Sequence, residues 1–127
     1  MEPVLRSFLF GDAVVPSHHG KLLCYGVFSD LWAPKFPVTH PRFSILTSWS
    51  RGTGFHIQVV KMFNPARTVM LNQSPEMYFT LEDESQTVHV QVDVNQIVFT
   101  EAGTYFFQIY LDSRLVAEHT LNYIQKS

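Results

Sequence analysis

The sequence predicts an all-β fold, an antiparallel β-sandwich, from three observations. Val88, Val90, Val92 and Val94 recur at every second position, with polar residues between them. This period is typical of a strand with one buried and one solvated face. Short apolar segments alternate with Gly, Pro, Asn and Asp turns along the whole chain, and no window has a helical period. The eleven Phe residues also favour pleated, half-buried surfaces.

The turn signals divide the chain into eight or nine short strands. We expect strands over residues 4–15, 21–30, 42–50, 55–63, 77–82, 87–98, 104–111 and 115–124, and a weaker one over 68–71. Residues 31–41 are expected to form a loop, because they contain three prolines and proline cannot donate to a sheet ladder. The third strand would place Phe43, Ile45 and Trp49 on one face. The expected core contains Val88, Val90, Val92, Tyr105, Phe107 and Ile109.

A short motif specifies the type of sandwich. Glu101-x-Gly103-x-Tyr105 opens a strand directly after the valine-alternating one, and it resembles the tyrosine corner of immunoglobulin-like domains. The resemblance implies an immunoglobulin-like sandwich in which Tyr105 hydrogen-bonds to backbone upstream of it. Phe107 stands where a secreted immunoglobulin domain has its second cysteine, so hydrophobic packing would replace the disulfide.

Composition limits the function classes. A chain of 127 residues with 46% hydrophobic and 16% charged residues is long enough for a single domain, residues 1–127, with a sizeable core. The net charge is −2 and the nine Lys and Arg form no cluster, which argues against nucleic-acid and membrane-surface binding. Cys24 is the only cysteine and lies among apolar neighbours, which indicates a buried thiol. With no signal peptide or membrane span, we expect a soluble cytoplasmic protein.

A broader resemblance covers nearly the whole chain. Residues 32–41 read Trp-x-Pro-x-Phe-Pro-x-x-His-Pro, and Gly20-Lys21 and Gly26 precede them. This arrangement is similar to that of a family of uncharacterised bacterial proteins of the same length. The resemblance implies a bacterial protein with one small β domain and implies no activity.

The 31–41 loop is the first candidate binding site for a ligand or partner. It brings together Trp32, Lys35, Phe36 and His40 on a segment stiffened by proline, and rigid aromatic groups lose little entropy on binding. If successive strands alternate in direction, loops 31–41, 64–67, 83–86 and 112–114 share one end of the sandwich, which adds Arg67, Asp112 and Arg114. The alternative is structural: Trp32 and Phe36 close the end of the sandwich, and His40 fixes the loop.

A second candidate is a flat sheet face. Phe106 and Tyr110 point away from the expected core on strand 104–111, and strand 55–63 has apolar residues on both faces, with Val60 and Met62 opposite Ile57 and Val59. If the two strands are neighbours, one sheet is apolar outside as well as inside. Such a patch usually marks a protein interface, and a symmetric dimer is the commonest outcome. The alternative is that a neighbouring loop or strand covers the patch.

Motifs for catalysis and metal binding are weak. The same alternation would leave His18, His19 and His56 as the only histidines able to share an ion, with Asp12 as a fourth candidate ligand. Their spacing matches no zinc pattern. There is no nucleophile elbow and no glycine-rich phosphate loop. The acidic residues 82–84 are expected to be solvent-exposed where the chain leaves the strand over 77–82. We therefore expect no catalytic residue, no metal and no cofactor.

The sequence thus favours a non-enzymatic interaction module that binds a protein partner or associates with itself. The alternative is a small-ligand or carbohydrate-binding sandwich that uses the 31–41 loop.

Overall fold

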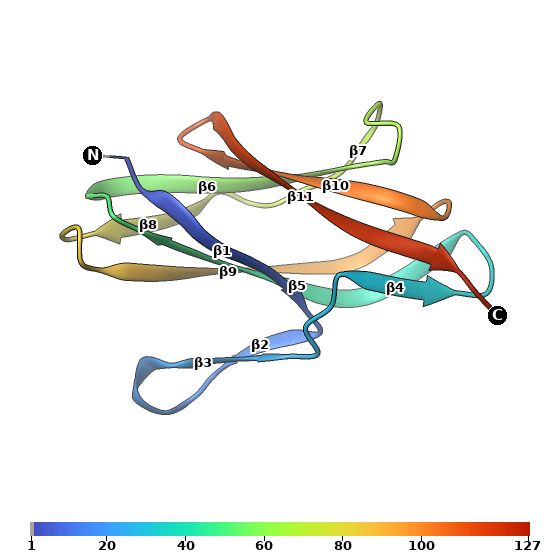
Figure 1. Ribbon diagram of the computed structural model, residues 1–127, viewed down its shortest axis with the longest axis horizontal. Helices are drawn as coiled ribbons and strands as arrows, with labels where there is room; N and C mark the ends of the chain where they lie inside the picture. Colours follow the sequence, from blue (N-terminus) through green and yellow to red (C-terminus); the bar gives the residue numbers. More distant parts are fainter. Residues whose placement is uncertain (1) are drawn as a thin grey trace.

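The protein is an immunoglobulin-like β-sandwich built from two facing sheets, as the sequence predicts (Figure 1). The structure, a computed structural model, describes residues 2–127. One sheet has three strands in the order β1-β5-β9, all antiparallel. Their bounds are Val4–Gly11, Val38–Ser50 and Thr87–Phe99.

The second sheet has six strands. Its order is β4-β11-β10-β6-β7, and β8 pairs with β6 beside β7. Every pair is antiparallel except β4 and β11, which run parallel. The bounds are β4 Asp30–Ala33, β6 Gly54–Phe63, β7 Met70–Gln73, β8 Met77–Leu81, β10 Gly103–Leu111 and β11 Arg114–Gln125.

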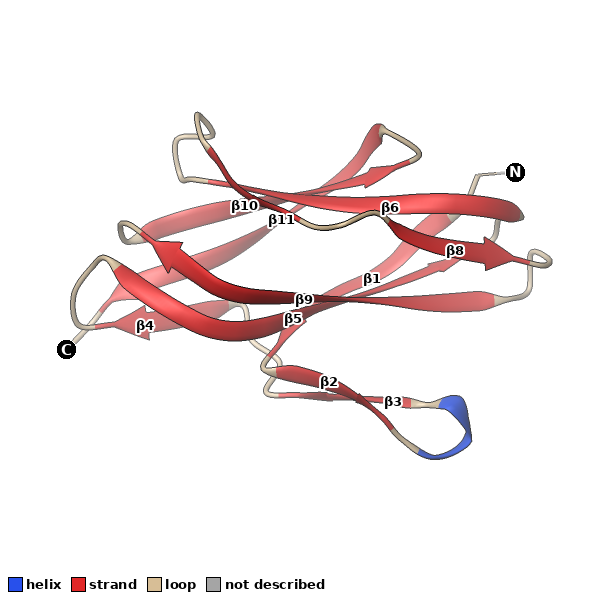
Figure 2. Cartoon of the chain, turned by 180° about the vertical axis from the view of Figure 1, so that it is seen from behind, coloured by secondary structure: helices blue, strands red, loops and turns tan. Residues whose placement is uncertain are grey.

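A separate hairpin, which we call the arm, stands off the sandwich. It consists of β2 (Ala13–Pro16) and β3 (Leu22–Tyr25), joined by a turn that contains the 3₁₀ segment His18–Gly20. Figures 1 and 2 show the arm projecting beyond the three-stranded sheet. The expected continuous strands 4–15 and 21–30 are therefore wrong. The first is interrupted at Asp12, and the second ends at Tyr25 before the chain re-enters the sheet as β4.

The predicted loop over 31–41 is also mostly strand. Residues 30–33 form β4 and β5 begins at Val38, so only a short connection separates them. The prolines are compatible with this arrangement because Pro34 and Pro37 lie in the connection and only Pro41 lies within a strand. Across residues 2–127 the structure has eleven strands rather than eight or nine, and the arm and β4 account for most of the difference.

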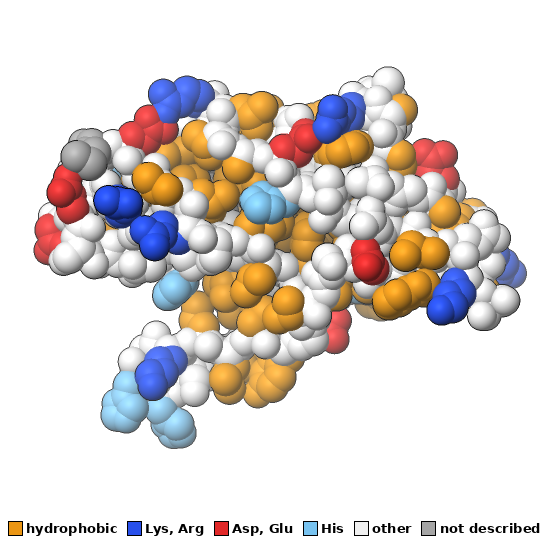
Figure 3. All heavy atoms as spheres, viewed as in Figure 1, with side chains coloured by type: hydrophobic (Ala, Val, Ile, Leu, Met, Phe, Trp, Pro, Cys, Tyr) orange, Lys and Arg blue, Asp and Glu red, His pale blue; other side chains and the backbone are white. Residues whose placement is uncertain are grey.

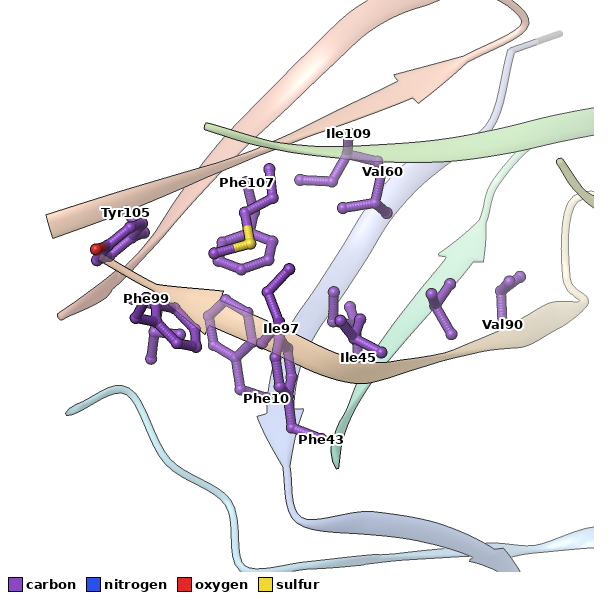
Figure 4. Close-up of a cluster of buried hydrophobic side chains, with 14 of the residues drawn as sticks. Phe10, Phe43, Ile45, Val60, Val90, Ile97, Phe99, Tyr105, Phe107 and Ile109 are labelled. Carbon is purple, nitrogen blue, oxygen red and sulfur yellow. The ribbon is translucent and has the colours of Figure 1, made fainter. Parts of the chain in front are cut away.

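The predicted core is confirmed. Val90 and Val92 are buried, Val88 packs at the margin of the core, and Tyr105, Phe107 and Ile109 are 0 to 1% exposed. Figure 4 shows Val90, Tyr105, Phe107 and Ile109 among the side chains that meet between the two sheets. Phe43, Ile45 and Trp49 share the inner face of β5, as expected from their alternation.

The tyrosine corner forms as the resemblance implied. The Tyr105 hydroxyl donates to the backbone oxygen of Glu101 at 2.6 Å, and the Glu101 backbone N–H donates back to that hydroxyl at 3.3 Å. Phe107, at the cysteine position, makes edge-to-face contacts with Phe10 at 4.9 Å and Phe43 at 6.2 Å. Aromatic packing therefore joins the two sheets at this position.

The expected sorting of loops between the two ends is wrong for several turns. A Cβ at Gly103 would lie 2.9 Å from Pro65, so turn 100–103 shares an end with turn 64–67. The backbone N–H of Asp112 donates to the carbonyl of Ile57 at 2.9 Å, so turn 112–113 lies near the start of β6. The cause is that β7 and β8 both run antiparallel to β6 and pair with successive parts of it, so they run in the same direction. The expected alternation treated them as two strands of opposite direction, which exchanges the ends of all later loops.

Candidate functional site

The aromatic residues of segment 31–41 do not converge on one site. Trp32 is 55% exposed on the outer side of edge strand β4. Phe36 packs edge-to-face on Tyr123 at 5.5 Å, which matches the structural alternative in which this ring closes the end of the sandwich. His40 is half-buried on β5 with its ring 5.7 Å from that of Phe43. Trp32 is the only one of the three that is largely exposed.

The three cationic residues of the predicted site are also separated. Lys35 is exposed in the connection before β5. Arg67 forms an ion pair with Glu118 at 2.6 Å on the outer side of the six-stranded sheet. Arg114 pairs with Glu2 at the opposite end of the sandwich from Lys35, because the β10–β11 turn lies beside the start of β6. The expectation that Arg114 stands with the 31–41 segment is therefore wrong.

The expected histidine trio is separated as well. His18 and His19 lie in the turn of the arm, while both ring nitrogens of His56 have partners in the sandwich. These partners are Asp112, at 2.7 Å from Nδ1, and the backbone oxygen of Thr53, at 2.8 Å from Nε2. Residues 2–127 hold no group of three His, Cys, Asp or Glu side chains placed to bind a metal ion.

Asp112 links the β10–β11 turn to β6. Burial alone would raise the pKa of its carboxyl group, but hydrogen bonds from His56 and from the backbone N–H of Ile57 outweigh that effect and lower the pKa. This contact is structural, because it fastens a turn to the strand that pairs with β10.

A hydroxyl–imidazole contact that no sequence motif marks lies on the three-stranded sheet. The Ser7 hydroxyl donates to the Ser48 oxygen at 2.9 Å, and Ser48 Oγ lies 2.7 Å from His89 Nδ1. The three residues are direct neighbours across β1, β5 and β9. Because β5 is the central strand, its N–H and C=O groups serve the ladders on either side. A hollow of about 470 Å³ lies beside this contact, and Arg6 and Arg51 are among the residues that line it.

The second predicted candidate, a flat sheet face, has the expected neighbours. β6 and β10 pair directly, with Val59 opposite Tyr110. Val60 and Met62 point inward and are 3% and 2% exposed, so Ile57 and Val59 lie on the outer side. Together with Tyr110, these two residues line a shallow hollow of about 270 Å³.

The most exposed part of this face is an aromatic pair. Phe55 on β6 and Tyr78 on β8 are 61% and 60% exposed, and their rings stack at 5.7 Å. We call Phe55, Tyr78, Ile57, Val59 and Tyr110 the aromatic face. Lys61, which lies 4.3 Å over the Tyr110 ring, and the residues Gln73, Glu76, Asp112 and Ser113 give the hollow a polar margin.

Farther along the outer side of this sheet, Arg67 covers the ring of Phe106. The guanidinium of Arg67 lies 3.9 Å over Phe106, so this predicted member of the apolar surface is half-buried. The covering alternative therefore applies to Phe106, while Phe55 and Tyr78 stay accessible.

No helix within residues 2–127 is long and apolar enough to cross a membrane. A comparison with curated proteins finds no match. Among solved structures, the chain is similar to an immunoglobulin-like protein from Pseudomonas aeruginosa, with 15% identity, a TM-score of 0.45 and 97% of each chain covered. It is also similar to the sensor domain of the anti-sigma factor RsgI4 in Pseudobacteroides cellulosolvens, with 8% identity, a TM-score of 0.43, and 98% of this chain and 93% of that chain covered. The sequence pattern of the family of unknown function DUF6941 matches residues 6–123, and the chain therefore belongs to that family.

Proposed function

We propose that the protein is a non-enzymatic interaction module that binds a protein partner through the aromatic face. The single observation that carries this proposal is the stacked, exposed pair Phe55 and Tyr78 at 61% and 60% exposure. Large aromatic side chains that cluster in the open on one sheet face usually mark an interface. The partner would present an apolar protrusion to the hollow over Ile57 and Val59.

The chemistry of this face suits a protein rather than a reaction. Each buried aromatic ring removes about 150–250 Å² of surface from water, and apolar area contributes about 25 cal/mol per Å². Lys61, Glu76 and Asp112 surround the apolar centre with charges of both signs, as in the polar rim of many interfaces.

The partner is another protein or a second copy of the chain, and the compartment we propose is the bacterial cytoplasm. The single Cys24, which can form no disulfide within the chain, fits a reducing compartment.

Phe55→Ser combined with Tyr78→Ser tests this function. Sedimentation velocity of the purified chain would measure self-association, and affinity capture with identification of the captured chains would measure other partners. We expect the double variant to lose the partner that the parent holds. Trp32→Ser is the matched control, because it removes an aromatic ring of 55% exposure from the opposite end of the same sheet. A double variant that keeps every partner, or a parent that binds nothing at high concentration, contradicts the proposal.

The small-ligand alternative has one observation in its favour, the exposed indole of Trp32. A Trp32→Ala chain that folds and binds everything the parent binds would eliminate it.

A further inference from the structure

The sandwich has an open seam between β1 of one sheet and β11 of the other. β4 pairs only with Asn122 to Gln125, and within residues 2–127 no strand pairs with the earlier part of β11 on that side. β1 likewise pairs with β5 alone, apart from one isolated bridge between Phe10 and Phe28. Two strand edges therefore face the seam with unused backbone groups.

The chain itself fills one half of this seam. The N–H of Phe28 donates to the carbonyl of Phe10 at 3.0 Å, and the N–H of Asn122 donates to the carbonyl of Ser29 at 3.1 Å. Residues 28–29 therefore bridge the edges of both sheets, and β4 continues from them along β11. This segment is an internal example of an extended strand held in the seam.

The direction of the free β11 groups follows from that contact. In a strand, residues two apart point their N–H and C=O groups to the same side. Since the Asn122 N–H points into the seam, the backbone groups of Thr120 and Glu118 point there as well. Thr120 and Glu118 are exposed, so these groups are accessible to a further strand.

A hollow of about 290 Å³ lies in the seam beside residues 28–29, and both apolar side chains and polar groups line it. Phe8 and His119 form one wall and stack at 4.4 Å with nearly parallel rings. Leu9 and Val27, which are 38% and 57% exposed, contribute apolar surface. Burial lowers the pKa of the His119 imidazole, because the charged form loses hydration in this hollow. Figure 3 shows hydrophobic side chains gathered where the arm joins the body.

We propose that the open half of the seam binds an extended segment of a partner protein, which pairs with β11 as an added strand and inserts one large apolar side chain into the hollow. Main-chain hydrogen bonds to Thr120 and Glu118 supply affinity, and the hollow between Phe8, Val27 and His119 supplies selectivity for the apolar residue. An extended segment fits better than a folded surface, because the seam is bounded by two strand edges and the chain's own residues 28–33 already occupy its other half as a strand. The inference does not depend on the aromatic face, which lies on the outer side of the six-stranded sheet.

Thr120→Pro is the sharpest variant, because proline removes the N–H that faces the seam, and edge positions tolerate proline. Thr120→Val is its matched control, since it loses the hydroxyl group but keeps the backbone donor. The probe is a library of short random peptides displayed on phage and selected against the purified full chain. We expect selected peptides with a large apolar residue to bind the parent and Thr120→Val, and to bind Thr120→Pro about fivefold to tenfold more weakly, the effect of one net hydrogen bond.

A second pair of variants covers the case in which Thr120→Pro fails to fold. Val27→Glu places a charge in the hollow at a 57% exposed position, while Leu23→Glu places one on the arm at a 44% exposed position. Val27→Glu should lose the selected peptides and Leu23→Glu should keep them. Peptide binding should also slow hydrogen exchange at the Thr120 and Glu118 amides. No enrichment of peptides on the parent, or equal binding by Val27→Glu, would overturn the proposal. Loss of Phe55 and Tyr78 should leave this binding unchanged, which separates it from the proposed function.

Discussion

Replacing Tyr105 with phenylalanine removes one hydroxyl group from the corner and leaves the buried ring in place. That ring is 0% exposed, and its oxygen holds both backbone groups of Glu101, at 2.6 Å to the carbonyl and 3.3 Å to the N–H. A typical hydrogen bond contributes about 1 kcal/mol net. Because Glu101 is exposed, water can replace the hydroxyl group at its backbone, so the loss stays near that net figure per bond.

We therefore expect Tyr105→Phe to lower the free energy of unfolding by about 1–2 kcal/mol. For a domain of 127 residues, the average unfolding entropy per residue converts this loss to about 4–7 °C in melting temperature. Urea unfolding followed by tryptophan fluorescence measures the change. The slope of the unfolding free energy against urea concentration should stay constant, because the surface exposed on unfolding does not change.

Tyr110→Phe is the matched control for this experiment. The Tyr110 hydroxyl donates to Gln108 Oε1 at 2.8 Å on the outer side of the same strand, and the residue is half-buried. Its removal should cost less than about 0.5 kcal/mol, as is usual for a surface substitution. Equal losses from Tyr105→Phe and Tyr110→Phe, or no loss from Tyr105→Phe, would refute the claim that the corner stabilises this fold.

Three further predictions concern other parts of the molecule. Phe107→Ala should lower the unfolding free energy by about 3–5 kcal/mol and Phe106→Ala by clearly less, since these neighbours lie on opposite sheet faces; thermal unfolding measures both. Hydrogen bonds lower the folded pKa of Asp112, so its ionised form stabilises the fold above the ordinary pKa, and this stabilisation is lost as the pH falls through the folded value. Asp112→Asn should therefore flatten the acid limb of the stability–pH curve, whereas an unchanged limb would contradict the role of the His56 contact. Trp32→Ala should change the unfolding free energy by less than about 0.5 kcal/mol, measured in urea, because the indole is 55% exposed.

Local patterns predicted the sandwich because its core depends on them. The alternation along residues 88–94 determines which side chains face inward, and it does so independently of which strand is the neighbour. The tyrosine corner at Tyr105 needs only residues that are close to it in the chain. The flat sheet face expected from the sequence requires β6 and β10 to be neighbours, and the two strands pair directly.

The candidate site could not be assembled from the sequence, because the direction of every later strand depends on how earlier ones are counted. β7 and β8 run in the same direction along β6, and this places Arg114 at the end of the sandwich opposite to the expected one. No local sequence signal shows that the chain continues in the same direction after the gap between β7 and β8. The sequence alone therefore determined the alternation that places Val90, Val92, Tyr105, Phe107 and Ile109 in the core. Only the tertiary structure decided which exposed rings meet on the aromatic face and which strand edges stay open beside β11, because both depend on pairings between residues far apart in the chain.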